Sequence, residues 1–234
     1  PLRIKAVLLP FKGKIIYDGV FQSYNIFFGS GIKGSLREEY APGHVVVPDQ
    51  LYDRTKSLRP ATFFDEGLVV HIAFDKPLDR ALADLIEQAA RAAGATCHRG
   101  GTLVVMEGPQ FSTLAESQEN RRAGFSLIGM TALPEAKLAR EAEIAYATLA
   151  LVTDYDCWHP DHDAVTVDAI IRVLLGNADR ARGLVASLAG TITADGAGQS
   201  CACRHALDHA LITAPEARDP ALVEKLRSIA GRVL

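Results

Sequence analysis

A stretch of fourteen residues from Val152 to Val165, VTDYDCWHPDHDAV, holds four aspartates, two histidines, a cysteine and a tryptophan. Imidazoles, thiolates and carboxylates bind metals, and paired carboxylates also carry out general acid and base chemistry. Asp154 and Asp156 follow an apolar run two residues apart, so their side chains point the same way if the strand continues. The stretch is therefore compatible with a metal site, an acid/base pair, or a polar loop that caps a helix.

A second polar segment, MEGPQFSTLAES (106–117), also begins at the end of an apolar run. Open α/β sheets place ligands where their strands end, which favours both segments as binding loops. Gly108-Pro109 predicts a turn that presents the ring of Phe111 beside the small hydroxyl of Ser112. An aromatic face and paired carboxylates suit a purine with exocyclic donors, although a loop with ordinary surface carboxylates is the alternative.

The glycines at 29, 31 and 34 spell G-x-G-x-x-G after the apolar run YNIFF. In a dinucleotide site these glycines open a long helix, whereas here Ala41-Pro42-Gly43 leaves room for at most two turns. We therefore expect a Gly-rich turn, whose backbone amides could hold an anion, rather than a dinucleotide site.

Cys201-x-Cys203-x-His205-x3-His209 has the residue types of a zinc motif. The C-x-C spacing is tighter than the paired C-x2-C of most structural zinc sites, so we expect no metal. A disulfide across a single residue is geometrically demanding, and four cysteines suit a reducing cytoplasm, so we expect thiols. A zinc-dependent hydrolase is kept as a minor alternative.

Composition argues against several classes of protein. The formal net charge is −3, and no stripe of lysine and arginine of the kind that binds nucleic acid is present. No apolar run reaches the roughly 20 residues of a membrane span, and Pro10 interrupts the N-terminal apolar run before any signal cleavage site. We expect a cytoplasmic protein with neither nucleic acid nor membrane as a partner.

Short apolar runs alternate with helical patterns, which predicts the α/β class with a largely buried sheet. The runs are KAVLL, YNIFF, HVVVP, LVVHIAF, TLVVM, FSLIGM and AYATLALV. Helical spacing predicts helices over about 82–93, over about 167–188, and from Asp219-Pro220 onward. The chain has no internal repeat, so we expect one domain over residues 1–234.

Several longer strings resemble the methylthioadenosine phosphorylase branch of the purine nucleoside phosphorylase family, and they follow one another in the order found in that family. They are GSLREEYAPG (34–43), PDQLYDRTKSLRPATFF (48–64), MEGPQFSTLAES (106–117), GMTALPEAKLAREA (129–142) and TDYDCWHPDHDAVTVD (153–168). The resemblance implies a three-layer α/β/α fold with a central mixed sheet. It also implies phosphorolysis of 5'-methylthioadenosine in purine and methionine salvage, with phosphate as co-substrate, no cofactor, and a homotrimer or homohexamer.

The resemblance also assigns roles to single residues. Asp154 is expected to share a proton with purine N7 as the general acid, and Asp156 to hold the 6-amino edge. Phe111 and Ser112 line the base, and Met130 lies under the ribose. The apolar pocket for the alkylthio group, whose burial contributes roughly 25 cal/mol per Å², matches His71, Val167, Ile170 and Ile171. The phosphate positions match Thr131, Thr153, Gly31, Ile32 and Lys12.

Residues 1–33 diverge from the family pattern, and Phe11 and Lys12 stand where the family has arginine and histidine. A lysine is a point charge, whereas arginine binds phosphate with two parallel hydrogen bonds. An impaired phosphate site would make the chain a nucleoside-binding protein without turnover. Residues 190–234 are expected to form a C-terminal loop and helices.

The purine preference is the other open alternative. Relatives that prefer 6-oxopurines have glutamate at the position of Ser112 and asparagine at that of Asp154. An ionised aspartate accepts from an amino group and repels a carbonyl oxygen, so this pair favours adenine. The alternative is a purine nucleoside or methylthioinosine phosphorylase.

Overall fold

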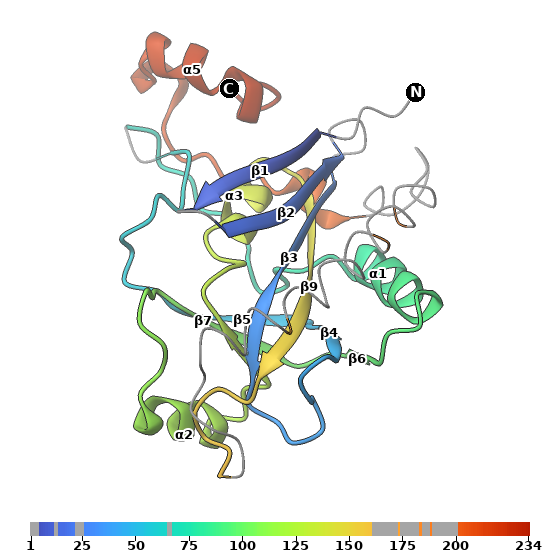
Figure 1. Ribbon diagram of the computed structural model, residues 1–234. Coiled ribbons are helices and arrows are strands. Elements are labelled where there is room, and N and C mark those ends of the chain that lie inside the picture. The colour runs from blue at the N-terminus through green and yellow to red at the C-terminus, as the bar shows by residue number, and fades with distance from the viewer. Residues whose placement is uncertain are drawn as a thin grey trace.

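The protein is described by a computed structural model (Figure 1). It describes residues 5–11, 14–21, 26–64, 67–160 and 201–234, together with positions 173, 183 and 188. Side chains are described from residue 31 onward within these ranges. Four predicted site residues, Lys12, Val167, Ile170 and Ile171, lie outside the described residues, as does most of the helix predicted over 167–188.

Strands of both directions form one mixed sheet of nine strands. They are β1 (Lys5–Phe11), β2 (Lys14–Phe21), β3 (Ile26–Ser35), β4 (Val45–Val47), β5 (Gln50–Arg54), β6 (Cys97–Arg99), β7 (Thr102–Met106), β8 (Leu127–Gly129) and β9 (Ala145–Asp154). The order is β5-β7-β8-β3-β9-β4-β6, and the β1–β2 hairpin continues from β3. β3 is parallel to β9 but antiparallel to β8, which confirms the expected mixed sheet.

Strand β9 is buried on both sides, as expected of a central strand with a continuous apolar run. Its alternate residues Ala145, Ala147, Leu149 and Leu151 pack in the cluster that contains α1 (Arg80–Ala92). Tyr146, Ala150 and Val152 pack in the cluster that contains α3 (Glu135–Glu141). Because side chains alternate across a strand, the two helices cover opposite faces, and the three-layer α/β/α fold is confirmed.

The helix ends follow the local sequence. Asp79 caps α1 by accepting from the backbone N–H of Leu82 at 2.7 Å, and Gly94 follows the helix with φ +74°. Asp219 caps α5 (Pro220–Ala230), so the predictions of both helices are confirmed. An additional helix, α2 (Leu114–Arg122), begins with a capping box between Thr113 and Glu116.

Three expectations from the sequence are wrong. The glycines at 29, 31 and 34 lie inside strand β3, where pairing with β9 holds the backbone extended, and so they form no turn. The run LVVHIAF makes only a bridge between Val70 and Leu211, because it lies against the C-terminal segment rather than in the sheet. Cys201 and Cys203 form a disulfide, since the turn between them brings their Cα atoms to 5.1 Å.

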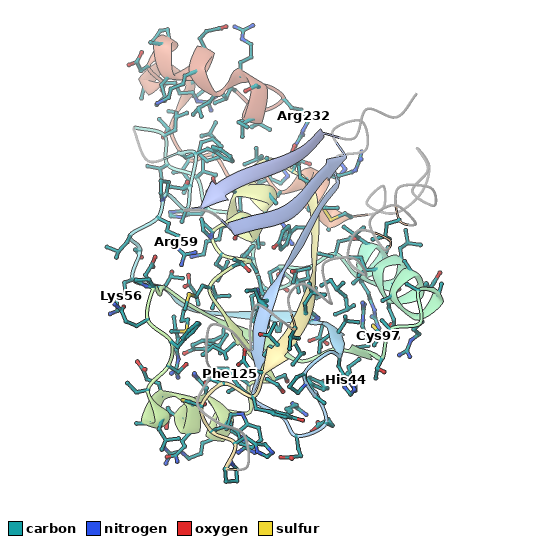
Figure 2. The ribbon with its side chains drawn as sticks, viewed as in Figure 1. His44, Lys56, Arg59, Cys97, Phe125 and Arg232 are labelled. Carbon is teal, nitrogen blue, oxygen red and sulfur yellow. A yellow bond between two sulfur atoms is a disulfide. The ribbon has the colours of Figure 1, made fainter. Side chains whose placement is uncertain are left out.

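The C-terminal segment packs on residues 63–64 and 67–72 and on the turn before β9. Its core, shared with Phe64 and Leu68, comprises Leu207, Ala210, Leu222, Leu226 and Ala230. Arg232, which lies near the C-terminal end of the chain (labelled in Figure 2), pairs with Glu143 and Asp208 and so connects the end of the chain to that turn. Among the described residues, no helix combines the length and apolar character needed to cross a bilayer.

Candidate active site

Strand β3 is the element on which the predicted site converges. It lies between β8 and β9, which run in opposite directions, so the segments that follow these two strands leave from different points along it. Gly31 lies beside Thr131, which follows β8, and Gly34 pairs with Asp154 at the end of β9. The site therefore lies along the second half of β3 rather than at one common edge of the sheet.

Asp154 is held by two hydrogen bonds. Its Oδ2 accepts from the hydroxyl of Thr153 at 2.6 Å, and its Oδ1 accepts from the backbone N–H of Asp156 at 2.8 Å. Burial raises the pKa of Asp154 above its ordinary value, and these two hydrogen bonds oppose the rise. A carboxyl group that keeps its proton to higher pH can act as a general acid.

Asp156 lies beside Asp154 and has φ +54°, so its backbone turns directly after the strand. Burial raises the pKa of Asp156, the neighbouring hydroxyls of Ser117 and Ser112 oppose the rise, and the charge of Asp154 adds to it. The hydroxyls of Ser117 and Ser112 lie near this carboxyl, but among the described residues no donor reaches its buried Oδ2 in hydrogen-bond geometry. An acceptor in this state suits a ligand that brings its own donor.

Glycine at position 34 makes room for this carboxyl pair. A Cβ atom there would lie 2.9 Å from Asp154 Oδ1 and 3.3 Å from Asp156 Cβ. Both distances are tighter than ordinary contacts, so only glycine leaves the carboxylates where they are. The third glycine of the G-x-G-x-x-G string therefore serves the site sterically.

The loop after β9 is anchored on the loop after β3. The indole N–H of Trp158 donates to the carbonyl of Ser35 at 2.7 Å, and the hydroxyl of Tyr155 donates to the carbonyl of Glu38 at 3.1 Å. Arg121 stacks on the Trp158 ring, 3.3 Å from its centroid. Trp158 thus packs between the two loops and fixes the position at which the carboxylates leave the strand.

Ser112 and Met130 lie beside these groups. Cys157, next to Asp156, has its sulfur 3.4 Å from the carbonyl oxygen of Ser112. Met130 packs over Gly108, where a Cβ atom would lie 2.6 Å from the methionine sulfur. The structure therefore brings the 106–117 segment together with both strand ends, as the sequence predicted.

Phe111 and His71 make no direct contact with the carboxyl pair of Asp154 and Asp156 that the structure records among the described residues. Phe111 has 50% of its surface exposed. His71 is exposed, and its backbone N–H donates to the carbonyl of Ala210 at 2.9 Å. Among the described residues, no hydrogen bond or ring contact joins either side chain to the carboxyl pair. Their expected roles at the base and the alkylthio group stay predictions.

Four of the five predicted phosphate residues, those within the described part of the chain, lie around a lysine that the sequence analysis did not select. Lys33 donates from Nζ to Thr131 Oγ1 at 2.5 Å and to the carbonyl of Ile32 at 3.3 Å. The hydroxyl of Thr153 lies 3.4 Å from the backbone oxygen of Lys33. A lysine between Gly31 and Gly34 in an otherwise apolar strand is the signal that could have identified it.

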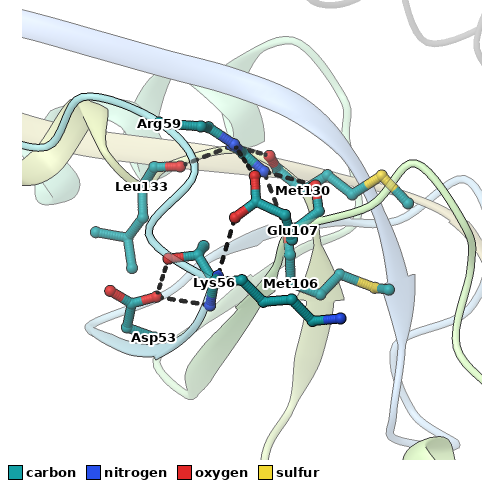
Figure 3. A network of polar contacts seen from close by, with 8 residues as sticks. Asp53, Lys56, Arg59, Met106, Glu107, Met130 and Leu133 are labelled. Carbon is teal, nitrogen blue, oxygen red and sulfur yellow. Dashed lines mark hydrogen bonds and ion pairs between the residues drawn. The ribbon is translucent and has the colours of Figure 1, made fainter.

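Arg59 is a second residue that the sequence analysis missed, and it binds the ends of two strands (Figure 3). Its guanidinium pairs with Glu107 at 2.8 Å and donates to the carbonyls of Met130 at 2.8 Å and Leu133 at 3.0 Å. It also donates to the backbone carbonyl of Glu107 at 2.7 Å. The fork geometry of arginine allows these simultaneous bonds, which position the segments after β7 and β8.

The cysteines and histidines between Cys201 and His209 are not arranged as a metal site in the described part of the chain. The disulfide occupies both Cys201 and Cys203, and His205 pairs with Asp208 at 3.1 Å. In the described ranges, no group of three histidine, cysteine or acidic side chains is placed to hold a metal ion.

Comparison with known proteins identifies the family. A family model described as "Phosphorylase superfamily" matches residues 23–189. The chain belongs to the phosphorylase superfamily.

Among its relatives in this superfamily, S-methyl-5'-thioadenosine phosphorylase of Chloroflexus aurantiacus is 59% identical over 199 residues. That match covers 85% of this chain and 68% of the relative. The enzyme of the same name from Gloeobacter violaceus is 50% identical over 98% of this chain and 77% of its own length.

The fold of this phosphorylase-superfamily chain also matches a solved structure. A crystal structure of methylthioadenosine phosphorylase sourced from an antarctic soil metagenomic library has a TM-score of 0.81 and 42% identity. The match covers 88% of this chain and 71% of that one. The nucleoside phosphorylase-like fold inferred from the sequence is therefore confirmed.

Proposed function

We propose that this chain is a pentosyltransferase that cleaves 5'-methylthioadenosine with phosphate, giving adenine and 5-methylthioribose 1-phosphate. The observation that carries the proposal is the partly buried pair of Asp154 and Asp156, whose pKa values are both raised, at the end of β9. The 59% identity to a methylthioadenosine phosphorylase supports the same reaction.

In the proposed reaction, a phosphate oxygen forms a bond to the anomeric carbon while the bond from that carbon to purine N9 breaks. The electron pair of the broken bond goes to the purine, and the carboxyl of Asp154 gives a proton to N7, so adenine leaves neutral. The proton lost by hydrogenphosphate restores Asp154. The balance needs no oxidant, reductant or metal.

The selectivity for adenine is proposed to come from both carboxylates, with Asp154 at N7 and Asp156 at the 6-amino group. The buried Oδ2 of Asp156, which lacks a partner among the described residues, can accept from an exocyclic amino group. A 6-oxopurine would bring a carbonyl oxygen to the same place and leave two acceptors facing each other. Such an unpaired buried contact costs about 1–3 kcal/mol.

The test is phosphate-dependent release of adenine from 5'-methylthioadenosine, measured by chromatography with and without phosphate. We expect adenine and 5-methylthioribose 1-phosphate in equal amounts, no release without phosphate, and no loss of activity with a chelator. Asp154→Asn should lower kcat/KM by about 100-fold or more. Adenine release that does not depend on phosphate, or faster cleavage of methylthioinosine, would contradict the proposal.

We also propose, by analogy with the family, a homotrimer or homohexamer in which a neighbouring subunit helps to close each site. The exposure of His71, away from the carboxyl pair in a single chain, is compatible with a role at such a boundary. Sedimentation analysis should give the mass of three or six chains, and a monomer at assay concentration would contradict it. The cytoplasmic location stays a prediction.

A further inference from the structure

Lys33 is the most buried charged side chain that the structure describes, with 1% of its surface exposed. Lysine is almost never fully buried unless its ammonium is paired, because removing the charge from water is expensive. The side chain is not simply enclosed by apolar residues, because its Nζ donates a hydrogen bond to the hydroxyl of Thr131. The ammonium is therefore held in place by protein groups rather than by solvent.

Two glycines shape the space that the lysine fills. A Cβ atom at Gly129, in β8, would lie 2.2 Å from Lys33 Cδ, so the lysine stem crosses β8 at the only kind of residue that permits it. A Cβ atom at Gly31 would lie 3.0 Å from Nζ and 2.8 Å from Thr131 Oγ1. The ammonium is therefore held at one point, between β3 and the segment after β8.

That point is where Gly31, Ile32 and Thr131, which are predicted to bind phosphate, meet. Thr131 accepts from the ammonium, the Ile32 carbonyl lies 3.3 Å from Nζ, and Gly31 lies beside both groups. The hydroxyl of Thr153 lies 3.4 Å from the backbone oxygen of Lys33 and 2.6 Å from the Oδ2 atom of Asp154. Thr153 therefore connects the backbone of Lys33 with the carboxyl proposed as the general acid.

We propose that Lys33 binds the phosphate co-substrate and supplies the positive charge that holds it against the nucleoside. This proposal rests on the proposed function and adds a residue to its phosphate side. Hydrogenphosphate carries two negative charges, and an ammonium donates up to three hydrogen bonds as a compact point charge. In a buried site a charge-assisted hydrogen bond of this kind is about twice as strong as a neutral one.

A purely structural role is the alternative, in which the ammonium only ties β3 to the Thr131 segment. That role predicts a loss of stability in a Lys33 variant, with equal effects on both substrates. Phosphate binding predicts a loss specific to phosphate. The two roles therefore separate in the KM for phosphate and in the stabilisation that phosphate gives.

The experiment compares Lys33→Met with the wild type and with Lys56→Met, which removes the same charge from an exposed position after β5. For Lys33→Met we expect the KM for phosphate to rise by roughly 10- to 100-fold, with the KM for methylthioadenosine within about 2-fold. Lys56→Met should match the wild type in both. An unchanged KM for phosphate, or equal rises for both substrates, would overturn the proposal.

A binding measurement covers the case in which the chain has no phosphorylase activity. Inorganic phosphate should raise the Tm of the wild type and of Lys56→Met, and raise that of Lys33→Met much less. An equal rise in all three would overturn the role of Lys33. Absence of turnover with a Lys33-dependent rise would instead contradict only the proposed reaction.

Gly31→Ala is a second variant that keeps the lysine. The new methyl group would meet both Nζ and the hydroxyl of Thr131, so it competes for the space beside the ammonium. We expect a rise in the KM for phosphate of about 10-fold with little change in the KM for methylthioadenosine. If Lys33→Met does not fold, a normal KM for phosphate in Gly31→Ala overturns the proposal.

Discussion

The guanidinium of Arg59 donates to the backbone carbonyl of Met130 at 2.8 Å, so a residue after β5 fixes the segment that leaves β8. The same group is paired with Glu107 after β7. Met130 and Thr131 therefore hold their places through a side chain that touches neither proposed substrate. Arg59 is a positioning residue rather than a catalytic one.

Arg59→Lys is expected to lower kcat/KM by about 10- to 100-fold and to lower the Tm by about 5 °C, because an ammonium cannot reach all of these acceptors. The KM for phosphate should rise with it, since Thr131 follows Met130. Arg91→Lys, at an exposed pair with Glu87, is the matched control and should change neither value. Normal kinetics in Arg59→Lys would refute the positioning role.

Asp154→Asn is expected to change the purine preference as well as the rate. An asparagine amide can donate to the oxygen of a 6-oxopurine, so the ratio of kcat/KM for methylthioinosine to that for methylthioadenosine should rise by about 10-fold or more. Steady-state kinetics on both nucleosides measures the ratio. The exposed Asp49→Asn is the control, and a ratio that stays constant in Asp154→Asn would count against the proposed contact with the purine.

The same variant has an expected effect on stability that depends on pH. Burial raises the pKa of Asp154 in the folded chain above its unfolded value, so the folded state holds the proton to higher pH. Stability from this group is then lost as the pH rises from the unfolded pKa through the folded one. Asp154→Asn should therefore raise the Tm by about 2–4 °C at pH 7 and have little effect near pH 4. A gain of equal size at both pH values would show that the carboxyl ionisation is not its cause.

His98 gives the opposite dependence. Its Nε2 lies 3.0 Å from Nδ1 of His44, and burial, together with the charge of His44, lowers its pKa in the folded chain. Stability is then lost as the pH falls through the unfolded value towards the folded one. Between pH 8 and pH 5 the Tm of the wild type should fall by roughly 1–3 °C more than that of His98→Asn, a modest effect because the pair is partly solvated.

Urea unfolding at the same pH values provides an independent measure. His205→Asn, at an exposed histidine paired with Asp208, is the control for the loss of any imidazole. If His98→Asn and the wild type lose the same free energy of unfolding between pH 8 and pH 5, the histidine pair is not the cause of the pH dependence.

The sequence by itself determined the class of fold and much of the carboxyl side of the site. The apolar run of β9 predicted a buried central strand, Asp219 lies at the helix start where a cap was expected, and Asp154 and Asp156 lie at the end of that strand, as the polar residues after the apolar run indicated. These are local properties, because periodicity, capping and turn chemistry depend on residues close together in the chain.

Only the tertiary structure decided what the glycines and the lysine of β3 do. The string G-x-G-x-x-G suggested a turn, but pairing with β9 and β8 kept it extended, and Gly31 and Gly34 instead make room for Thr131, Lys33 and Asp154. Arg59 and Met130 lie 71 positions apart in the chain, and Lys33 and Thr131 lie 98 apart. Contacts over such separations depend on which strands become neighbours, and no local pattern specifies that order.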